Sequence, residues 1–154
     1  MLIRSAWIAF SIVCLSAAAS NAQQPLEKFQ VLFNGTNLDG WSGDPSLWSV
    51  SQGAIVGQTT EQNPIKGNTF LVWQGGEVAD FEFRCKVRFE GNNSGVQYRS
   101  ETVGGNSHAL QGYQADLHEN QNYFGMMYGE RYAGRGIIAQ RGQKLLIDSD
   151  GSKK

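Results

Sequence analysis

The chain has few of the residues that build disulfide scaffolds and zinc sites. It holds two cysteines and two histidines among 154 residues. Cys14 lies in an apolar leader, so Cys85 is left without an internal disulfide partner. The spacing of His108 and His118 matches no zinc motif. These absences exclude a small domain held together by disulfides and a zinc site of the finger or protease type.

An excess of charge of one sign and a helical hydrophobic period are also lacking. Thirteen basic residues face fourteen acidic ones, a net charge of −1, which is too balanced to attract nucleic acid or an anionic membrane. Nineteen glycines and little helical periodicity favour short strands joined by tight turns. Without a helix after a glycine-rich turn, no phosphate-binding loop is expected. The sequence therefore predicts an all-β protein that binds neither nucleic acid nor nucleotide.

The first 22 residues have the pattern of a secretory signal. Arg4 is followed by an apolar run over residues 6–15, and small residues lead to Ala22. The run is too short to cross a hydrocarbon core of ~30 Å, so no membrane anchor is expected. We expect export to the periplasm or the medium, with one folded domain over residues 23–154. The sequence leaves the oligomeric state open.

Alternating apolar and polar residues predict the strands. The clearest alternation runs over residues 81–89, and shorter ones follow over 96–101 and 113–118. Further short strands are predicted at residues 29–33, 47–50, 54–57, 69–73, 124–128 and 136–139. Many short strands at regular spacing predict a sandwich of two antiparallel sheets.

If the three alternating strands are neighbours, their polar side chains form one patch, because opposite residues on adjacent strands lie about 5 Å apart. The patch comprises Glu82, Arg84, Lys86, Gln97, Arg99, Gln114, Asp116 and His118. Tyr128 and Glu130 could extend it. A solvated sheet face without function is the alternative interpretation. Against it, Gln and Asp are uncommon in strands and suit sugar hydroxyls, and a nearby Trp41 or Tyr128 could cover an apolar sugar face.

At this point the sequence resembles a known family. Residues 32–41, LFNGTNLDGW, are similar to the opening of the DUF1080 family, the 3-keto-disaccharide hydrolase domain. The likeness continues through residues 80–84, 93–99 and 112–116, and covers about residues 29–140. It implies a concanavalin A-like jelly roll of two antiparallel sheets. Family domains usually continue for several more strands, so the resemblance also implies that this sandwich is incomplete at its C-terminal end.

The resemblance implies an exported enzyme that cleaves glycosides already oxidised to a ketone at sugar carbon 3. A base removes the acidified C2 proton, the C1 substituent leaves and water adds. A non-catalytic carbohydrate-binding module of the same fold is the alternative. By position, Asp116 or Glu82 would be the base or the ligand of a divalent metal ion, Arg99 would hold the enolate, and Gln97 and Gln114 would bind hydroxyls. The further substrate-binding candidates are His118, Tyr128 and Trp41.

Overall fold

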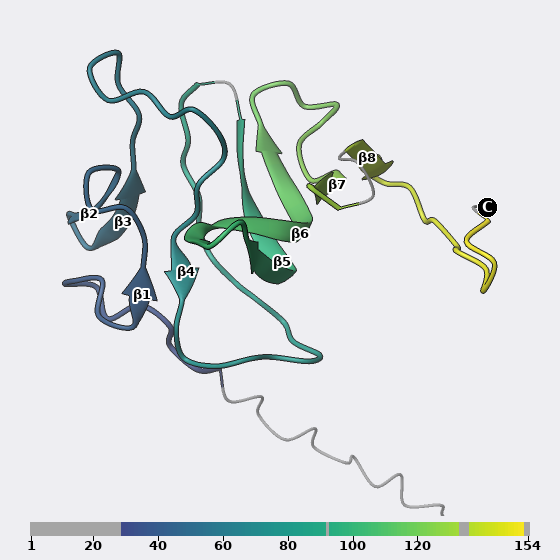
Figure 1. Ribbon diagram of the computed structural model, residues 1–154, viewed down its shortest axis with the longest axis horizontal. Coiled ribbons are helices and arrows are strands. Elements are labelled where there is room, and N and C mark those ends of the chain that lie inside the picture. The colour runs from purple at the N-terminus through teal and green to yellow at the C-terminus, as the bar shows by residue number, and fades with distance from the viewer. Residues whose placement is uncertain (1–28, 92, 133–135, 153–154) are drawn as a thin grey trace, which may run out of the picture. The chain divides into compact units, whose positions relative to one another are not determined.

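The computed structural model describes residues 29–91, 93–132 and 136–152. The secretory signal expected over residues 1–22 lies outside the described residues. The strands of the compact unit Val31–Lys154 are β1 (Trp41–Ser42), β2 (Trp48–Ser51), β3 (Ala54–Gly57), β4 (Val72–Trp73), β5 (Asn93–Val103), β6 (Asn106–His118), β7 (Met127–Glu130) and β8 (Gly136–Ala139) (Figure 1). No helix occurs among the described residues. The predicted all-β class is confirmed.

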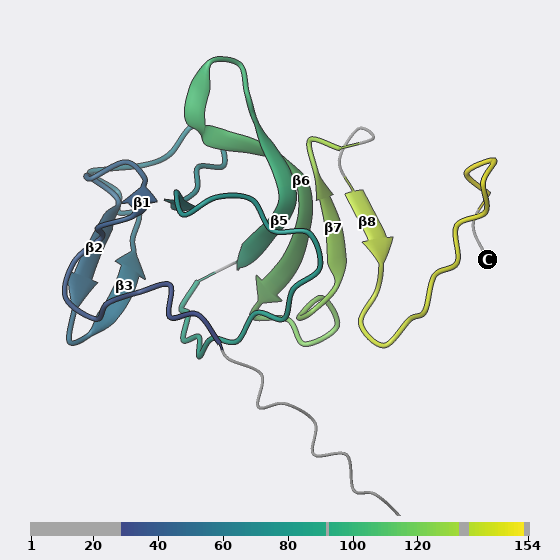
Figure 2. The ribbon, with the colours of Figure 1, turned by 90° about the horizontal axis from the view of Figure 1, so that it is seen from below.

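All the strand pairs are antiparallel. β1 pairs with β4 and β2 with β3 in two-stranded sheets, while β5, β6, β7 and β8 form a four-stranded sheet in that order. Figure 2 shows these four strands side by side. Within the four-stranded sheet, neighbouring strands are consecutive in the chain, as expected when strands are joined by short connections. The four-stranded sheet is the part of the fold that carries the candidate site.

The long hairpin β5–β6 is set by a two-glycine turn. Gly104 and Gly105 have φ angles of 65° and 68°, which are left-handed values that favour glycine. Two successive residues with positive φ match the right-handed twist of the flanking strands. Two register shifts follow the turn, between Val103 and Thr102 and between Glu101 and Tyr98, and beyond them Gln97 lies opposite Gln114 and Gly95 opposite Asp116.

A bulge interrupts β5 at Arg99. The pairing with β6 shifts between Tyr98 and Glu101, and Arg99 has a φ of 47°. A bulge adds an unpaired residue and breaks the alternation of side chains across the sheet. Opposite the bulge, a Cβ at Gly112 would overlap Ser100. Of the alternation predicted over residues 96–101, residues 96–98 therefore keep the pattern, whereas Arg99 departs from it.

The strand predicted most clearly, residues 81–89, is wrong: no strand forms there. The segment is extended but pairs with no strand of the described part of the chain, and Phe83 is 44% exposed. At its end, the Phe89 ring stacks on Phe124 with centroids 6.4 Å apart. Alternation describes which faces a strand would present, but a strand also needs a hydrogen-bonded neighbour. The alternation within residues 81–89 does not specify which segment, if any, would pair with them.

The other strand predictions have mixed outcomes. The hairpin expected around residues 48–57 and the strand at 136–139 are confirmed. The strand expected at 69–73 is reduced to β4, the one expected at 124–128 lies later, as β7, and residues 29–33 form none. In these three segments an apolar run therefore did not predict where a strand begins and ends, or whether one forms.

Apart from Leu47, the buried side chains lie on or directly beside the four-stranded sheet. The buried hydrophobic residues are Leu47, Ala109, Leu110 and Met126, and the buried polar ones are Gln114, Asp116 and Glu130. Since buried polar groups need a reason, the three polar residues direct attention to one region of the sheet.

Across the described ranges, no helix has the length and apolar content to span a membrane.

Candidate functional site

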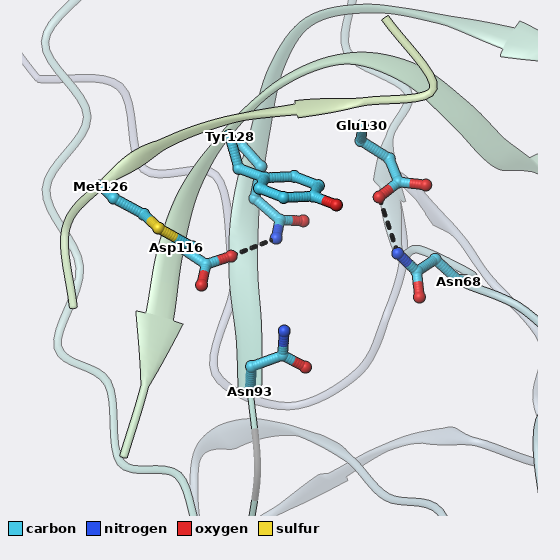
Figure 3. Close-up of a pocket in the computed structure, with 7 residues that line it drawn as sticks. Asn68, Asn93, Asp116, Met126, Tyr128 and Glu130 are labelled. Atoms are coloured by element: carbon cyan, nitrogen blue, oxygen red, sulfur yellow. Dashed lines mark hydrogen bonds between the residues drawn. The ribbon is translucent and has the colours of Figure 1, made fainter. Parts of the chain in front are cut away.

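One face of the β5–β6–β7 sheet carries a row of polar side chains. Gln97 lies opposite Gln114, and Gln114 lies opposite Tyr128. Asp116 and Glu130 are two residues further along β6 and β7, so their side chains share that face. A pocket of about 130 Å³ opens there and is lined by Asn68, Asn93, Gln114, Asp116, Met126, Tyr128 and Glu130 (Figure 3).

Two carboxylates are buried in this pocket. Asp116 and Glu130 are each 1% exposed. Figure 3 shows the Tyr128 ring lying between them and the Asn93 amide pointing into the same space. Acidic side chains are almost never fully buried unless other groups satisfy them. Two such groups in one pocket are the chemically most informative feature of the described chain.

Asp116 has one oxygen held and one available. Gln114 Nε2 donates a hydrogen bond of 2.6 Å to Asp116 Oδ1. Asp116 Oδ2 is buried and has no hydrogen-bond partner among the described residues. The backbone of Asp116 is bonded to Met126 O at 3.1 Å and to Gly125 N at 2.8 Å. A rigid main chain and one fixed oxygen therefore aim the second oxygen at whatever enters the pocket.

Glu130 is held from outside the sheet. Asn68 Nδ2, from the connection between β3 and β4, donates a hydrogen bond of 2.8 Å to Glu130 Oε2. Arg131 Nε lies 3.7 Å from Glu130 Oε1. Gly112, opposite Glu130, has no side chain to crowd it. The second carboxylate is thus oriented by a neutral amide on one side and a cation on the other.

Several predicted site residues do line the pocket. Gln114, Asp116 and Tyr128 lie where the alternation placed them, and Glu130, expected as an extension of the patch, joins them. Gln97 lies beside Gln114 on the same face. Both polar atoms of its amide are buried without a hydrogen-bond partner in the described part of the chain, although Gln97 does not line the pocket.

The expectation that Glu82 and Arg99 share this pocket is wrong. Glu82 lies on the unpaired segment, is exposed and forms an ion pair with Arg84, whose hydrogen bond lowers the pKa of Glu82. Arg99, turned by the bulge, donates hydrogen bonds to Ala79 O at 3.1 Å and Asp80 Oδ1 at 3.3 Å. The missing strand displaces the first residue, and the broken alternation displaces the second.

Trp41 and His118 are not lining residues, although His118 lies opposite the lining residue Asn93 in the pairing of β5 with β6. Trp41 Nε1 donates a hydrogen bond of 2.9 Å to Leu32 O, so its indole ties β1 to the preceding segment. His118 Nδ1 accepts a hydrogen bond of 2.9 Å from Asn120 N, and its ring packs edge-on to Tyr123. Both contacts are structural. The expected substrate-binding roles of these two residues gain no support from their positions.

Three lining residues were not singled out by the sequence. Asn93 lies outside the predicted strand over residues 96–101, yet it begins β5. Asn68 comes from an irregular connection, and Met126 precedes β7. The Asn-Ser-Gly piece of the family resemblance, residues 93–95, could have indicated Asn93. No local pattern distinguishes Asn68, because its place depends on the folded connection.

Of the two predicted metal ligands, only Asp116 lines the pocket. Glu82 and Asp116, the expected pair, are on separate parts of the fold. The described residues contain no group of three or more His, Cys, Asp or Glu that could hold a metal ion. Calcium takes about six to eight oxygen ligands, whereas magnesium is usually held by one or two carboxylates together with several waters. The divalent ion stays a prediction, and the chemistry of this pocket is derived from its own side chains.

Comparison with known proteins identifies the family. The sequence model of the 3-keto-alpha-glucoside-1,2-lyase-like domain matches residues 28–151, which include every residue of the pocket lining. No curated protein gives a significant match. No solved structure gives one either. The chain therefore belongs to the family of 3-keto-alpha-glucoside-1,2-lyase-like domains.

Proposed function

We propose that this chain cleaves 3-keto-glycosides by elimination, with Asp116 as the base. The observation that carries the proposal is the buried carboxylate of Asp116, whose Oδ2 has no hydrogen-bond partner among the described residues and lies in a polar pocket. Membership of the lyase-like family supplies the class of substrate. A rigid, water-poor setting is where a positioned carboxylate acts best on a carbon acid.

The proposed step balances without any oxidant or reductant. The C3 ketone acidifies the proton on C2, and Asp116 Oδ2 takes that proton while the electrons move onto the ketone oxygen as an enolate. The enolate then collapses, a C1–C2 double bond forms and the C1–oxygen bond breaks. The leaving oxygen takes a proton and departs as an alcohol. Water added later across the double bond gives net hydrolysis.

Other lining residues have roles that follow from their chemistry. The Asn93 amide lines the pocket and can donate a hydrogen bond to the enolate oxygen. Glu130 lies on the other side of Tyr128. In this proposal it donates the proton that the leaving oxygen takes. Tyr128 offers a ring to the apolar face of the sugar.

The pocket volume limits what can enter. At about 130 Å³ the pocket is smaller than the roughly 300 Å³ at which sites for drug-sized ligands begin. It therefore suits the single oxidised ring better than a whole disaccharide, and the leaving group would stay outside. The secretory signal expected over residues 1–22 would place this activity outside the cytoplasm.

The test compares matched substrates and single variants. Aryl glucosides with and without the C3 ketone are incubated with the wild-type chain, Asp116→Asn and Glu77→Gln, an exposed control outside the pocket lining. We expect turnover of the keto substrate only, and a fall in kcat of about 100-fold or more in Asp116→Asn, the range for losing a positioned base. Circular dichroism checks that each variant is folded.

The same assay separates the sequence-based roles from the geometric ones. Glu82→Gln is expected to keep its turnover, because Glu82 is exposed and paired with Arg84. Full turnover in a folded Asp116→Asn would contradict the proposal. Equal cleavage of the unoxidised substrate would point to an ordinary glycosidase instead. Saturable binding of the keto sugar without turnover would support the non-catalytic binding module.

A further inference from the structure

Gly95 stands inside β5 at a place where the backbone does not require glycine. It lies directly opposite Asp116 in the pairing of β5 with β6. Its φ angle is outside the left-handed range that favours glycine, so any L-residue could adopt this conformation. Glycine in the interior of a strand weakens the strand, and it commonly marks a close approach of another group. A neighbouring group, and not the backbone conformation, therefore explains a glycine at position 95.

The side chain of Gln114 occupies that space. A Cβ at position 95 would overlap Cγ and Cδ of Gln114 and would lie 2.8 Å from its Nε2. Gln114 is only 6% exposed, so the side chain has no free route into solvent. From this position its Nε2 donates the 2.6 Å hydrogen bond to Asp116 Oδ1. The orientation of the Gln114 side chain therefore depends on the absence of a side chain at Gly95.

We propose that Gly95 is a positioning residue for the pocket and acts through Gln114. By leaving room for the glutamine side chain, Gly95 allows Gln114 to fix one oxygen of Asp116 and leave Oδ2 for the substrate. This assigns one of the two N–H groups of Gln114 Nε2 to holding the carboxylate. The kinetic part of the inference rests on the proposed function, and the geometric part does not.

The kinetic test is Gly95→Ala with a matched glycine control. We expect kcat on the keto substrate to fall about tenfold, the scale for losing one hydrogen bond to a charged group, with little change in KM. Gly57→Ala is the control, because Gly57 also has an ordinary strand φ and a Cβ there would overlap the Trp48 ring, outside the pocket lining. Its folded fraction should keep the wild-type kcat. An unchanged kcat in Gly95→Ala would overturn the proposal.

A double-mutant cycle separates positioning from general packing. Gln114→Ala removes the side chain that a Cβ at 95 would displace, so Gly95→Ala should add almost nothing in that background. Fully additive losses would mean that Gly95 acts by another route. Should Gly95→Ala alone not fold, Gln114→Asn withdraws the amide from Asp116 without altering β5. The same fall in kcat is then expected, and wild-type kcat in that variant would overturn the proposal.

A spectroscopic measurement makes the two proposals fail separately. In the full chain, the side-chain amide signals of Gln114 in a ¹H–¹⁵N spectrum report its hydrogen bond to Asp116. These signals should move in Gly95→Ala and stay in place in Gly57→Ala. If the wild-type chain does not cleave keto sugars but the signals behave this way, the proposed function fails and the positioning stands. Unmoved signals in Gly95→Ala would sink the positioning, whatever the turnover.

Discussion

At the scale of single residues, the acidic side chains of this chain differ in what holds them. Asp116 and Glu130 are buried and each accepts a hydrogen bond from an amide, whereas Glu82 is exposed and paired with a guanidinium. A neutral donor fixes a carboxylate and leaves its charge available, as at Asp116, whereas a nearby cation offsets that charge, as at Glu82 and, at 3.7 Å, at Glu130. Residue type alone could not separate Glu82 from Glu130, since both follow the same alternation in sequence.

An exposed carboxylate gives a prediction for acid. The Ser46 hydroxyl and then its backbone N–H lower the pKa of Asp44, with bonds of 2.7 Å and 2.9 Å. A carboxyl group with a lowered folded pKa stabilises the fold above its unfolded pKa of about 3.9. That contribution is lost as the pH falls through the folded pKa. Ser46→Ala should therefore raise the pKa of Asp44 towards its ordinary value and reduce stability above the unfolded pKa, and the difference from the wild-type chain should close as the pH falls through the folded pKa.

A carbon-detected NMR titration of the Asp44 carboxyl measures this directly, with acid unfolding followed in parallel. Ser49→Ala, which alters an exposed serine of β2, is the matched control. The retained backbone bond from residue 46 should leave part of the effect in place. An Asp44 titration that is the same in Ser46→Ala and in the wild-type chain would contradict the prediction.

At the scale of elements, local patterns predicted the strands whose partners are close in sequence. The hairpin β2–β3 and the shared polar face of β5 and β6 follow from alternation and from turn residues such as Gly53 and Gly104. The same alternation failed over residues 81–89, because a strand exists only when another segment completes its hydrogen bonds. It failed at Arg99 because a bulge shifts the period by one residue.

The candidate site was predictable to the same extent. Gln114, Asp116 and Tyr128 came from neighbouring strands, so their common face could be inferred from period two. Asn68 could not, since it reaches Glu130 from a connection without regular structure. Sequence reasoning thus found the lining residues of β6 and β7, and missed Asn93 at the start of β5 and Asn68 in the connection.

The two-glycine turn between β5 and β6 gives a prediction for stability. At Gly105 the φ angle is 68°, and a Cβ would meet nothing within 4 Å, so only backbone strain opposes a side chain. Gly105→Val should lower the free energy of unfolding by about 1–2 kcal/mol, the usual strain of a left-handed L-residue. Gly105→Asn should cost less, because asparagine tolerates this conformation. Urea unfolding of both variants measures the difference, and equal midpoints would contradict the prediction.

At the scale of the whole molecule, apolar side chains are divided unevenly between core and surface. Few hydrophobic residues of the described chain are buried, while Val78, Phe81, Phe83 and Val87 are exposed within one short segment. Single exposed apolar residues are ordinary, but a contiguous group is a surface that binds other apolar groups. Residues 78–87 are therefore a segment of the described chain that is prone to association.

Replacing two of these side chains should change the behaviour of the chain in solution. Phe83→Ser combined with Val87→Ser is expected to lower the fluorescence of a bound hydrophobic dye by about a third to a half, because it removes part of the contiguous apolar surface. The mass measured by light scattering should fall towards that of one chain. Lys86→Ser, on the polar side of the segment, is the control and should alter neither signal. Unchanged dye binding in the double variant would contradict the prediction.

The bond from Asn68 to Glu130 spans 62 positions of the chain, and this bears on how the molecule assembles. The β5–β6 hairpin needs only neighbouring residues to meet, whereas this bond closes a long loop and waits for distant parts to come together. We expect the sheet to appear early in refolding and the ordered mouth of the pocket to appear last. Regained turnover would then mark the end of folding, later than the signal of the strands.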